Sequence, residues 1–137
     1  MVKLEKLSAF EAGKRHKEII PMLESAIDQA DGEYTVADII ECISRGEQGC
    51  LGVFDGMELI GVFTVMLITY PRRRAIRLVT MGGLPVDRWS EVEPALIQFV
   101  KDNDCSAMEC WCRDGAAKIA TEAFKANHHY NVVVREV

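Results

Sequence analysis

The chain has 137 residues, of which 49% are hydrophobic and 27% charged, the composition of a globular protein rather than of a disordered or fibrous one. The formal net charge of −5 argues against broad binding to nucleic acid or acidic membranes, because such binding requires a basic surface. A chain of this length is expected to form a single domain, spanning residues 1–137.

The number of cysteines and the length of the apolar runs bear on where in the cell the protein is expected. There are five cysteines, an odd number, and the first residues contain no apolar signal segment. Free thiols in a reducing compartment are therefore expected rather than a disulfide framework. The longest apolar run, residues 59–70, is too short to span a bilayer. The sequence predicts a cytoplasmic protein that does not contact membranes.

The first part of the chain predicts a short edge strand and two helices. Residues 2–9 alternate loosely in polarity, as a strand does. Apolar residues at helical spacing predict a helix over 18–30, with Pro21 in the first turn, where proline is tolerated. Thr35 is followed three residues later by an acid, a capping box that predicts a second helix over 36–45.

Three strands are expected next, as an antiparallel meander. Residues 49–54 and 58–70 are rich in β-branched and aromatic side chains, and Asp55-Gly56 between them is a strong hairpin signal. A polar turn then leads into a third strand over 75–81.

The last part of the chain predicts two helices, each followed by a strand. Ser90 and an acid three residues later form a capping box for a helix over 90–102, the most regular amphipathic pattern in the chain. A strand over 106–113, a helix over 115–127 and a closing strand over 130–137 follow.

This order of elements resembles the GNAT (Gcn5-related N-acetyltransferase) fold over essentially the whole chain. The resemblance implies an α/β (α+β) fold, β-α-α-β-β-β-α-β-α-β, with a mixed central sheet of about six to seven strands and about four helices. It also implies that acetyl-CoA lies in a V between the strands at 75–82 and 106–112, with its pyrophosphate on backbone amides at the start of the central helix. The expected cofactor-binding residues are Met81, Gly82, Gly83 and Ser90.

Three residues depart from the family pattern. The family signature before the central helix is Gln/Arg-x-x-Gly-x-Gly/Ala, which residues 81–89 do not match. Pro85 lacks an amide donor, and Asp87 places a negative charge where a pyrophosphate would lie. The family's proton-donating tyrosine corresponds to Phe124, which has no proton to give. These departures favour a domain that has lost its catalytic function.

The sequence is also similar to short GNAT-like proteins of tailed bacteriophages, on the segments IIPMLESAI, EYTVADIIECISRGEQGCLGVF and CWCRDGAAKIATEAF. The main hypothesis is therefore a catalytically degenerate GNAT-like domain that serves as a phage-type structural, assembly or interaction module, in the host cytoplasm or in the virion. The alternative is an acetyl-CoA-dependent N-acetyltransferase that acts on an unknown amine. The residues alone establish no cofactor, and acetyl-CoA is implied only by the resemblance.

Two further sets of side chains could carry chemistry. Glu109 lies within a predicted strand, where burial would raise its pKa toward that of a general base, and the alternative is a solvated or arginine-paired carboxylate. Cys110 and Cys112 share a face of that strand and could be metal ligands or a nucleophile pair, but the sequence favours small core residues. No metal site is predicted.

The arginines Arg72, Arg73 and Arg74 stand together in the turn before the third meander strand. They could bind a phosphate or an acidic partner, or could simply protect a sheet edge and keep the turn soluble. We expect a protein partner or self-association, and no binding of nucleic acid.

Overall fold

The computed structural model describes residues 2–28, 32–112, 114–127, 130 and 132–137. The described residues form a five-stranded sheet in the order β1-β2-β3-β4-β5, in which β4 and β5 pair in parallel and all other neighbours are antiparallel. The strands are β1 (Val2–Leu7), β2 (Gly49–Asp55), β3 (Glu58–Thr69), β4 (Arg74–Gly82) and β5 (Ala107–Cys110). The helices are α1 (Ala9–Lys14), α2 (His16–Ile27), α3 (Val36–Ser44), the 3-10 turn η1 (Val86–Arg88), α4 (Trp89–Asp102) and α5 (Asp114–Ala123).

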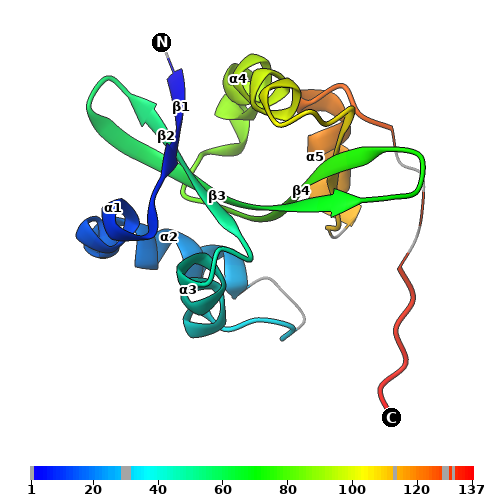
Figure 1. Ribbon diagram of the computed structural model, residues 1–137, viewed down its shortest axis with the longest axis horizontal. Coiled ribbons are helices and arrows are strands. Elements are labelled where there is room, and N and C mark those ends of the chain that lie inside the picture. Colours follow the sequence, from blue (N-terminus) through cyan, green and yellow to red (C-terminus); the bar gives the residue numbers. More distant parts are fainter. Residues whose placement is uncertain (1, 29–31, 113, 128–129, 131) are drawn as a thin grey trace.

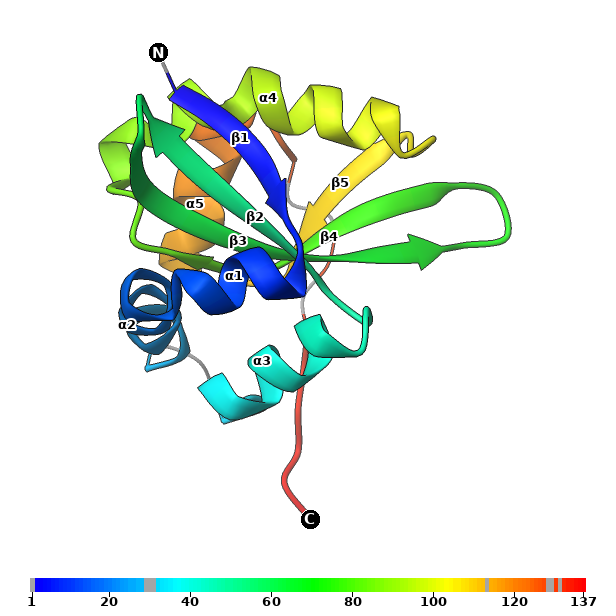
Figure 2. The same ribbon diagram turned by 60° about the vertical axis from the view of Figure 1, so that its left-hand side comes forward.

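The helices cover both faces of the sheet. Helices α1, α2 and α3 lie on one face, and α4 and α5 lie on the other (Figures 1 and 2). Each face has its own buried cluster. The α4/α5 side buries residues that include Phe63, Leu78 and Leu96. The α1–α3 side buries residues that include Leu23 and Ile39. This layered α+β arrangement agrees with the predicted fold class.

The expected start of the helix over 18–30 is wrong. Helix α2 begins at His16, so Pro21 lies inside the helix and not in its first turn. The reason is that α1 passes directly into α2 through Arg15, which ends one helix and precedes the other. The buried side chains of Ile19 and Leu23 fix α2 against the sheet, so tertiary packing outweighs the backbone hydrogen bond that Pro21 cannot make.

The capping box of the next helix is confirmed. The Asp38 backbone N–H donates to Thr35 Oγ1 at 3.2 Å, and the Thr35 N–H donates to Asp38 Oδ2 at 2.8 Å. The meander is also confirmed, with β2 and β3 joined by a tight turn in which Gly56 has a φ of +62°. The hairpin between β3 and β4 projects well beyond the helices (Figure 1).

The end of the chain differs from the prediction. Within the predicted strand at 130–137, residues 130 and 132–137 have no regular secondary structure, so the described part of the sheet has five strands rather than six or seven. Three consecutive valines favour extended backbone locally, but a strand forms only when a neighbour takes its hydrogen bonds. Arg113, His128 and His129 lie outside the described residues.

Buried Cys50 gives stability a pH dependence. Burial raises the pKa of this thiol from 9.0 to about 11, because the core disfavours the thiolate. The unfolded chain ionises first, so the contribution of Cys50 is complete below about pH 9 and is lost as the pH rises toward about 11. Between about pH 8 and pH 10.5 we expect the unfolding free energy to fall by about 2 kcal/mol more in the native chain than in Cys50→Ala. Urea unfolding of both chains checks this, and parallel pH profiles would contradict it.

Candidate functional site

Strand β4 is longer than its neighbour β5 and continues beyond it. They pair only from Ala75 to Leu78 of β4, and β5 ends at Cys110. Strand β4 continues to Gly82. The pairing of β4 with β3 shifts at this point, from Val65 opposite Leu78 to Thr64 opposite Thr80, so β4 carries one extra residue, a β-bulge. A bulge bends and twists its strand. Residues 79–82 of β4 extend past the end of β5, at the place where the resemblance predicts the V.

The glycines at the end of β4 leave room for helix α2, which packs against them. A Cβ on Gly82 would lie 2.2 Å from the carbonyl oxygen of Met22, and one on Gly83 would lie 2.8 Å from its side chain. Gly83 also has a φ of +80°, which favours glycine. Met81 packs against the cluster on the α4/α5 side. The close packing of α2 therefore explains why glycines stand at positions 82 and 83. The cofactor role expected for Met81, Gly82 and Gly83 stays a prediction.

The start of α4 differs from the capping box expected at Ser90. The helix begins at Trp89 with Arg88 as N-cap, no side chain caps it, and exposed Ser90 lies within the first turn. The Trp89 indole Nε1 donates to the Leu84 carbonyl oxygen at 3.1 Å, which ties the preceding loop to the helix. The start of α4 is thus set by a tertiary contact rather than by the local cap.

The guanidinium of Arg88 clasps two parts of the chain together. It donates to Asp55 Oδ2 at 3.1 Å and to Glu91 Oε2 at 2.9 Å. The hydrogen bond from Arg88 lowers the pKa of the Glu91 carboxyl. The carboxylates of Asp55 and Glu91 therefore both lie beside Arg88, and exposed Asp87 precedes it in the chain. The beginning of α4 is consequently acidic in character, which disfavours a phosphate there.

Phe124, which the resemblance aligns with a tyrosine, is a core residue. Its ring stacks on that of Trp89, with centroids 5.8 Å apart and planes within 3° of parallel. Both rings are buried, in the same cluster as Ala120 of α5 and Leu96 of α4. The stack explains an aromatic residue at this position without any chemical role.

The predicted general base, Glu109, is held in a polar cluster on the other face of the sheet. Arg77 lies opposite it on β4 and donates through Nε to Glu109 Oε1 at 2.7 Å. The Tyr70 hydroxyl donates to Glu109 Oε2 at 2.9 Å. The Arg77 guanidinium also stacks on the Trp111 ring, 4.0 Å from its centroid. Burial opposes the charge of Arg77, but the bonds to Glu109 and Tyr70 raise its pKa. The geometry is that of an arginine-paired carboxylate.

We expect Glu109→Gln to lower the free energy of unfolding by roughly 1–2 kcal/mol, because it leaves the charge of Arg77 without its partner in a largely buried place. The two side chains are only 18% and 20% exposed. Glu91→Gln is the matched control, since it removes a carboxylate from the more exposed pair with Arg88. Equal losses in urea unfolding for the two variants would contradict this expectation.

The arginine turn and the cysteine pair lie at opposite ends of the β4/β5 region. Arg72 and Arg73 are exposed at the tip of the projecting hairpin, and Arg74 opens β4. Their partner role stays a prediction. Cys110 is partly buried, and a hydrogen bond with Cys112, followed by burial, raises the pKa of its thiol. A raised pKa disfavours the thiolate that a nucleophile or a metal ligand needs.

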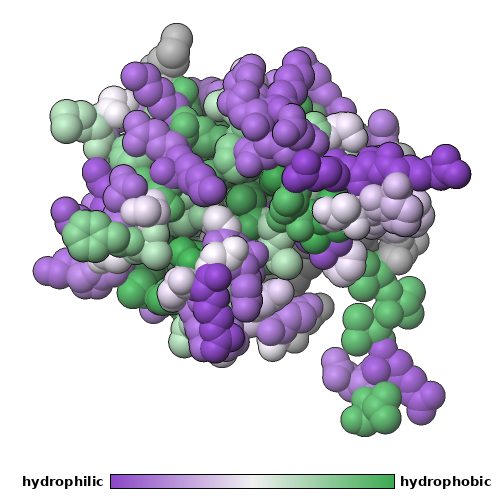
Figure 3. Space-filling view, in the orientation of Figure 1, coloured by the Kyte–Doolittle hydropathy of each residue, from purple (hydrophilic) through white to green (hydrophobic). Residues whose placement is uncertain are grey.

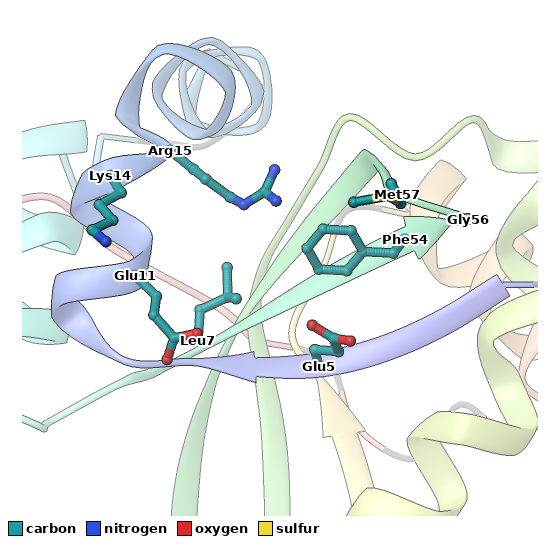
Figure 4. A pocket seen from close by; sticks show the side chains of 8 residues that line it. All are labelled: Glu5, Leu7, Glu11, Lys14, Arg15, Phe54, Gly56 and Met57. Atoms are coloured by element: carbon teal, nitrogen blue, oxygen red, sulfur yellow. The ribbon is translucent and has the colours of Figure 1, made fainter.

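A surface hollow of about 400 Å³ lies at the opposite edge of the sheet. It is formed between α1, β1 and the end of β2, and Figure 4 shows Arg15 pointing toward Phe54 across it. The Arg15 guanidinium lies 5.0 Å from the centroid of the Phe54 ring. Because this arginine is already engaged with the ring, and because β3 and β4 separate the hollow from the V, we do not include it in the candidate site.

Solved structures with this fold include several acetyltransferases. An aminoglycoside acetyltransferase, meta-AAC0020, from an uncultured soil metagenomic sample matches 99% of this chain and 95% of its own, at 13% identity and a TM-score of 0.68. The ribosomal-protein-alanine N-acetyltransferase of Brucella melitensis biovar Abortus 2308 matches over 100% of both chains, at 17% identity and 0.69. The aminoglycoside N-acetyltransferase AAC(6')-Iy, in complex with CoA, covers 100% of this chain and 95% of its own, at 10% identity and 0.70. The fold is that of the GNAT acetyltransferases.

At these identities the likeness shows the GNAT fold and nothing finer. No protein-family model and no curated protein sequence matches the chain. The similarity to phage proteins stays a prediction. Within the described residues, no helix is both long and apolar enough to cross a bilayer, and no three or more metal-ligating side chains gather in one place.

Proposed function

We propose that this chain is an acyl-CoA-dependent N-acyltransferase that uses the V between β4 and β5. The observation that carries the proposal is the length of β4: β5 pairs with it only as far as Leu78, and residues 79–82 extend beyond the end of β5. A free strand edge presents backbone amides and carbonyls, and the pantetheine arm of CoA has amide groups that can pair with them. The known acetyltransferases with this fold support the same use.

The β4 edge fits the pantetheine arm of CoA better than the start of α4 fits its phosphates. The β4 edge suits the pantetheine arm, because only backbone groups are required there. The start of α4 offers a helix N-terminus, but Asp87 and Glu91 place negative charge beside it, and Arg88 is already paired. We therefore expect binding that depends mainly on the acyl-pantetheine part and only weakly on the phosphates.

A bound acyl-CoA would supply an activated thioester, and the chain's task is to orient it and admit an amine. Phe124 cannot protonate the leaving thiolate, and Glu109 is committed to Arg77. The proton released by the amine and the one taken up by the thiolate therefore exchange with solvent in this proposal. Slow transfer with an accessible amine is expected, since general acid–base catalysis typically contributes about 10²–10⁴-fold.

The test is calorimetry and thermal shift of the whole chain with acetyl-CoA, with acetyl-pantetheine as a second probe, followed by an acetylation assay on a panel of amines. Heat and a raised melting temperature with both probes are expected. Ser90→Glu adds a charge at the start of α4 and should weaken acetyl-CoA binding more than acetyl-pantetheine binding. Ser106→Glu, the same change on the exposed residue before β5, is the matched control. Neither heat nor shift with either probe would refute the proposal.

A second candidate is a non-catalytic module that docks on another protein through its arginine hairpin. The specific observation in its favour is the Trp89–Phe124 stack, which replaces the family's phenol with core packing. Exposed Arg72 and Arg73 would then contact an acidic surface. Loss of a captured acidic partner in Arg72→Glu/Arg73→Glu, with no acetyl-CoA binding by the native chain, would favour this candidate over the first.

A further inference from the structure

The outer edge of β5 is open. β5 stands at the end of the sheet, and among the described residues no strand pairs with its outer side. Trp111 follows it directly and is 62% exposed. An open edge presents a row of backbone donors and acceptors and is a template for a further strand, unless the protein covers it. β1 is the other edge strand of the described sheet, and α4 packs near it.

The C-terminal residues have the properties of the missing strand. Val132, Val133, Val134 and Val137 are exposed, and Val133 is 90% exposed. Consecutive β-branched side chains favour extended backbone, and the sequence predicts a strand here. Exposed valines in a row are unfavourable in water, since burying each would gain the hydrophobic free energy of its side chain. The segment therefore lacks a partner that would cover it.

The two surfaces are complementary in pattern and charge. On β5, Glu109 points to one face, and Met108 and Cys110 to the other. Trp111, directly after the strand, contacts Arg77, the residue opposite Glu109. In a strand over 132–137, Val133 and Arg135 would share one face. That face would place a cation beside the Glu109 carboxylate and an aliphatic side chain beside the exposed indole. The valines of the opposite face would extend the apolar surface of Met108.

The C-terminal segment leads away from the sheet of its own molecule. In Figure 1 the C-terminal residues run away from the body, and Figure 2 shows that they end far from β5. In Figure 3 their hydrophobic side chains stand apart from the rest of the molecule. A segment that leaves its own sheet is available to a neighbour. Two copies can then exchange their segments reciprocally, which gives a closed two-fold dimer with no open edge on β5.

We infer that residues 132–137 of one copy add as a strand to the outer edge of β5 in a second copy, so that the protein is a strand-exchanged homodimer. The inference is independent of the proposed catalytic function. It commits to a second copy of this chain as the occupant of the edge. Pairing of the segment with β5 of its own chain is the competing outcome, which the experiment must separate.

The first measurement is the mass in solution, by light scattering and sedimentation, of the full chain and of a chain that stops after Asn131. A dimer that becomes a monomer on truncation is expected. Val133→Pro should also give a monomer, because proline removes a backbone donor from the strand. Val133→Thr, the matched control, keeps the β-branched shape and should remain a dimer. A full-length monomer, or a dimer that survives truncation, overturns the inference.

Hydrogen exchange of the backbone amides in 132–137 separates the two occupants. If the segment pairs with a second copy, its protection falls when the full chain is diluted until the dimer dissociates. If it pairs with its own β5, protection is the same at all concentrations, and the inference is wrong. Cooperative unfolding of the truncated chain in urea would show that the truncated chain is still folded and that only the dimer has been lost.

Discussion

Replacing Trp89 with alanine is expected to lower the free energy of unfolding by about 4 kcal/mol. Trp89 is only 9% exposed, and its indole stacks on the ring of Phe124, which follows α5 directly. It also satisfies the Leu84 carbonyl at 3.1 Å. Its removal leaves a cavity between α4 and α5 and frees the loop that leads from β4 into α4. Denaturant unfolding followed by circular dichroism measures the loss.

Trp111→Ala is the matched control, because it makes the same chemical change at an exposed site. That indole is 62% exposed and contacts Arg77 through its ring face. Only a cation–π contact of roughly 0.5–1 kcal/mol is at stake there. Similar losses for the two tryptophans would mean that the Trp89–Phe124 stack does not anchor α4 and α5.

Much of the fold follows from local pattern. The meander was predictable because each strand alternates or is continuously apolar, and Asp55-Gly56 marks the turn between the first two. The amphipathic helix α4 was predictable to within one residue at its start, since its apolar side chains recur at helical spacing. These signals are contained within a few residues of one another, and a single sequence reveals them.

The candidate site depends on contacts that no local pattern contains. Arg77 and Glu109 are 32 residues apart, and Tyr70 reaches Glu109 across 39 residues. Arg88 and Asp55 are separated by 33. The sequence did leave open an arginine-paired Glu109, but it could not say which arginine pairs with it. The strand register alone brings Arg77 opposite Glu109.

Two of the errors of local interpretation, at Ser90 and at residues 130–137, share a cause. Ser90 has the sequence of an N-cap, yet the helix starts earlier because the buried Trp89 indole fixes the chain there. Residues 130–137 have the composition of a strand, yet a strand requires a neighbour and not merely β-branched side chains. In both places tertiary surroundings outweigh propensity.

Gly82→Ala is expected to destabilise the fold by about 3 kcal/mol, although it adds only a methyl group. The new Cβ would lie 2.2 Å from the Met22 carbonyl oxygen and 2.7 Å from its carbonyl carbon. These are backbone atoms of α2, so no side-chain rotation can relieve the overlap. The helix must move away from the end of β4, and the hydrophobic contacts of Leu23 with the sheet weaken with it.

Gly13→Ala provides the control, because a Cβ at Gly13 in α1 meets no atom within 4 Å. There the change should stabilise the chain by roughly 0.5–1 kcal/mol, since alanine is the better helix former. Opposite signs for the two glycines in thermal and urea unfolding are the expected result. A Gly82→Ala chain as stable as the native one would mean that α2 does not press on the end of β4. The glycine at the mouth of the V would then lack the structural reason given to it, and a ligand that approaches its backbone would become the better explanation.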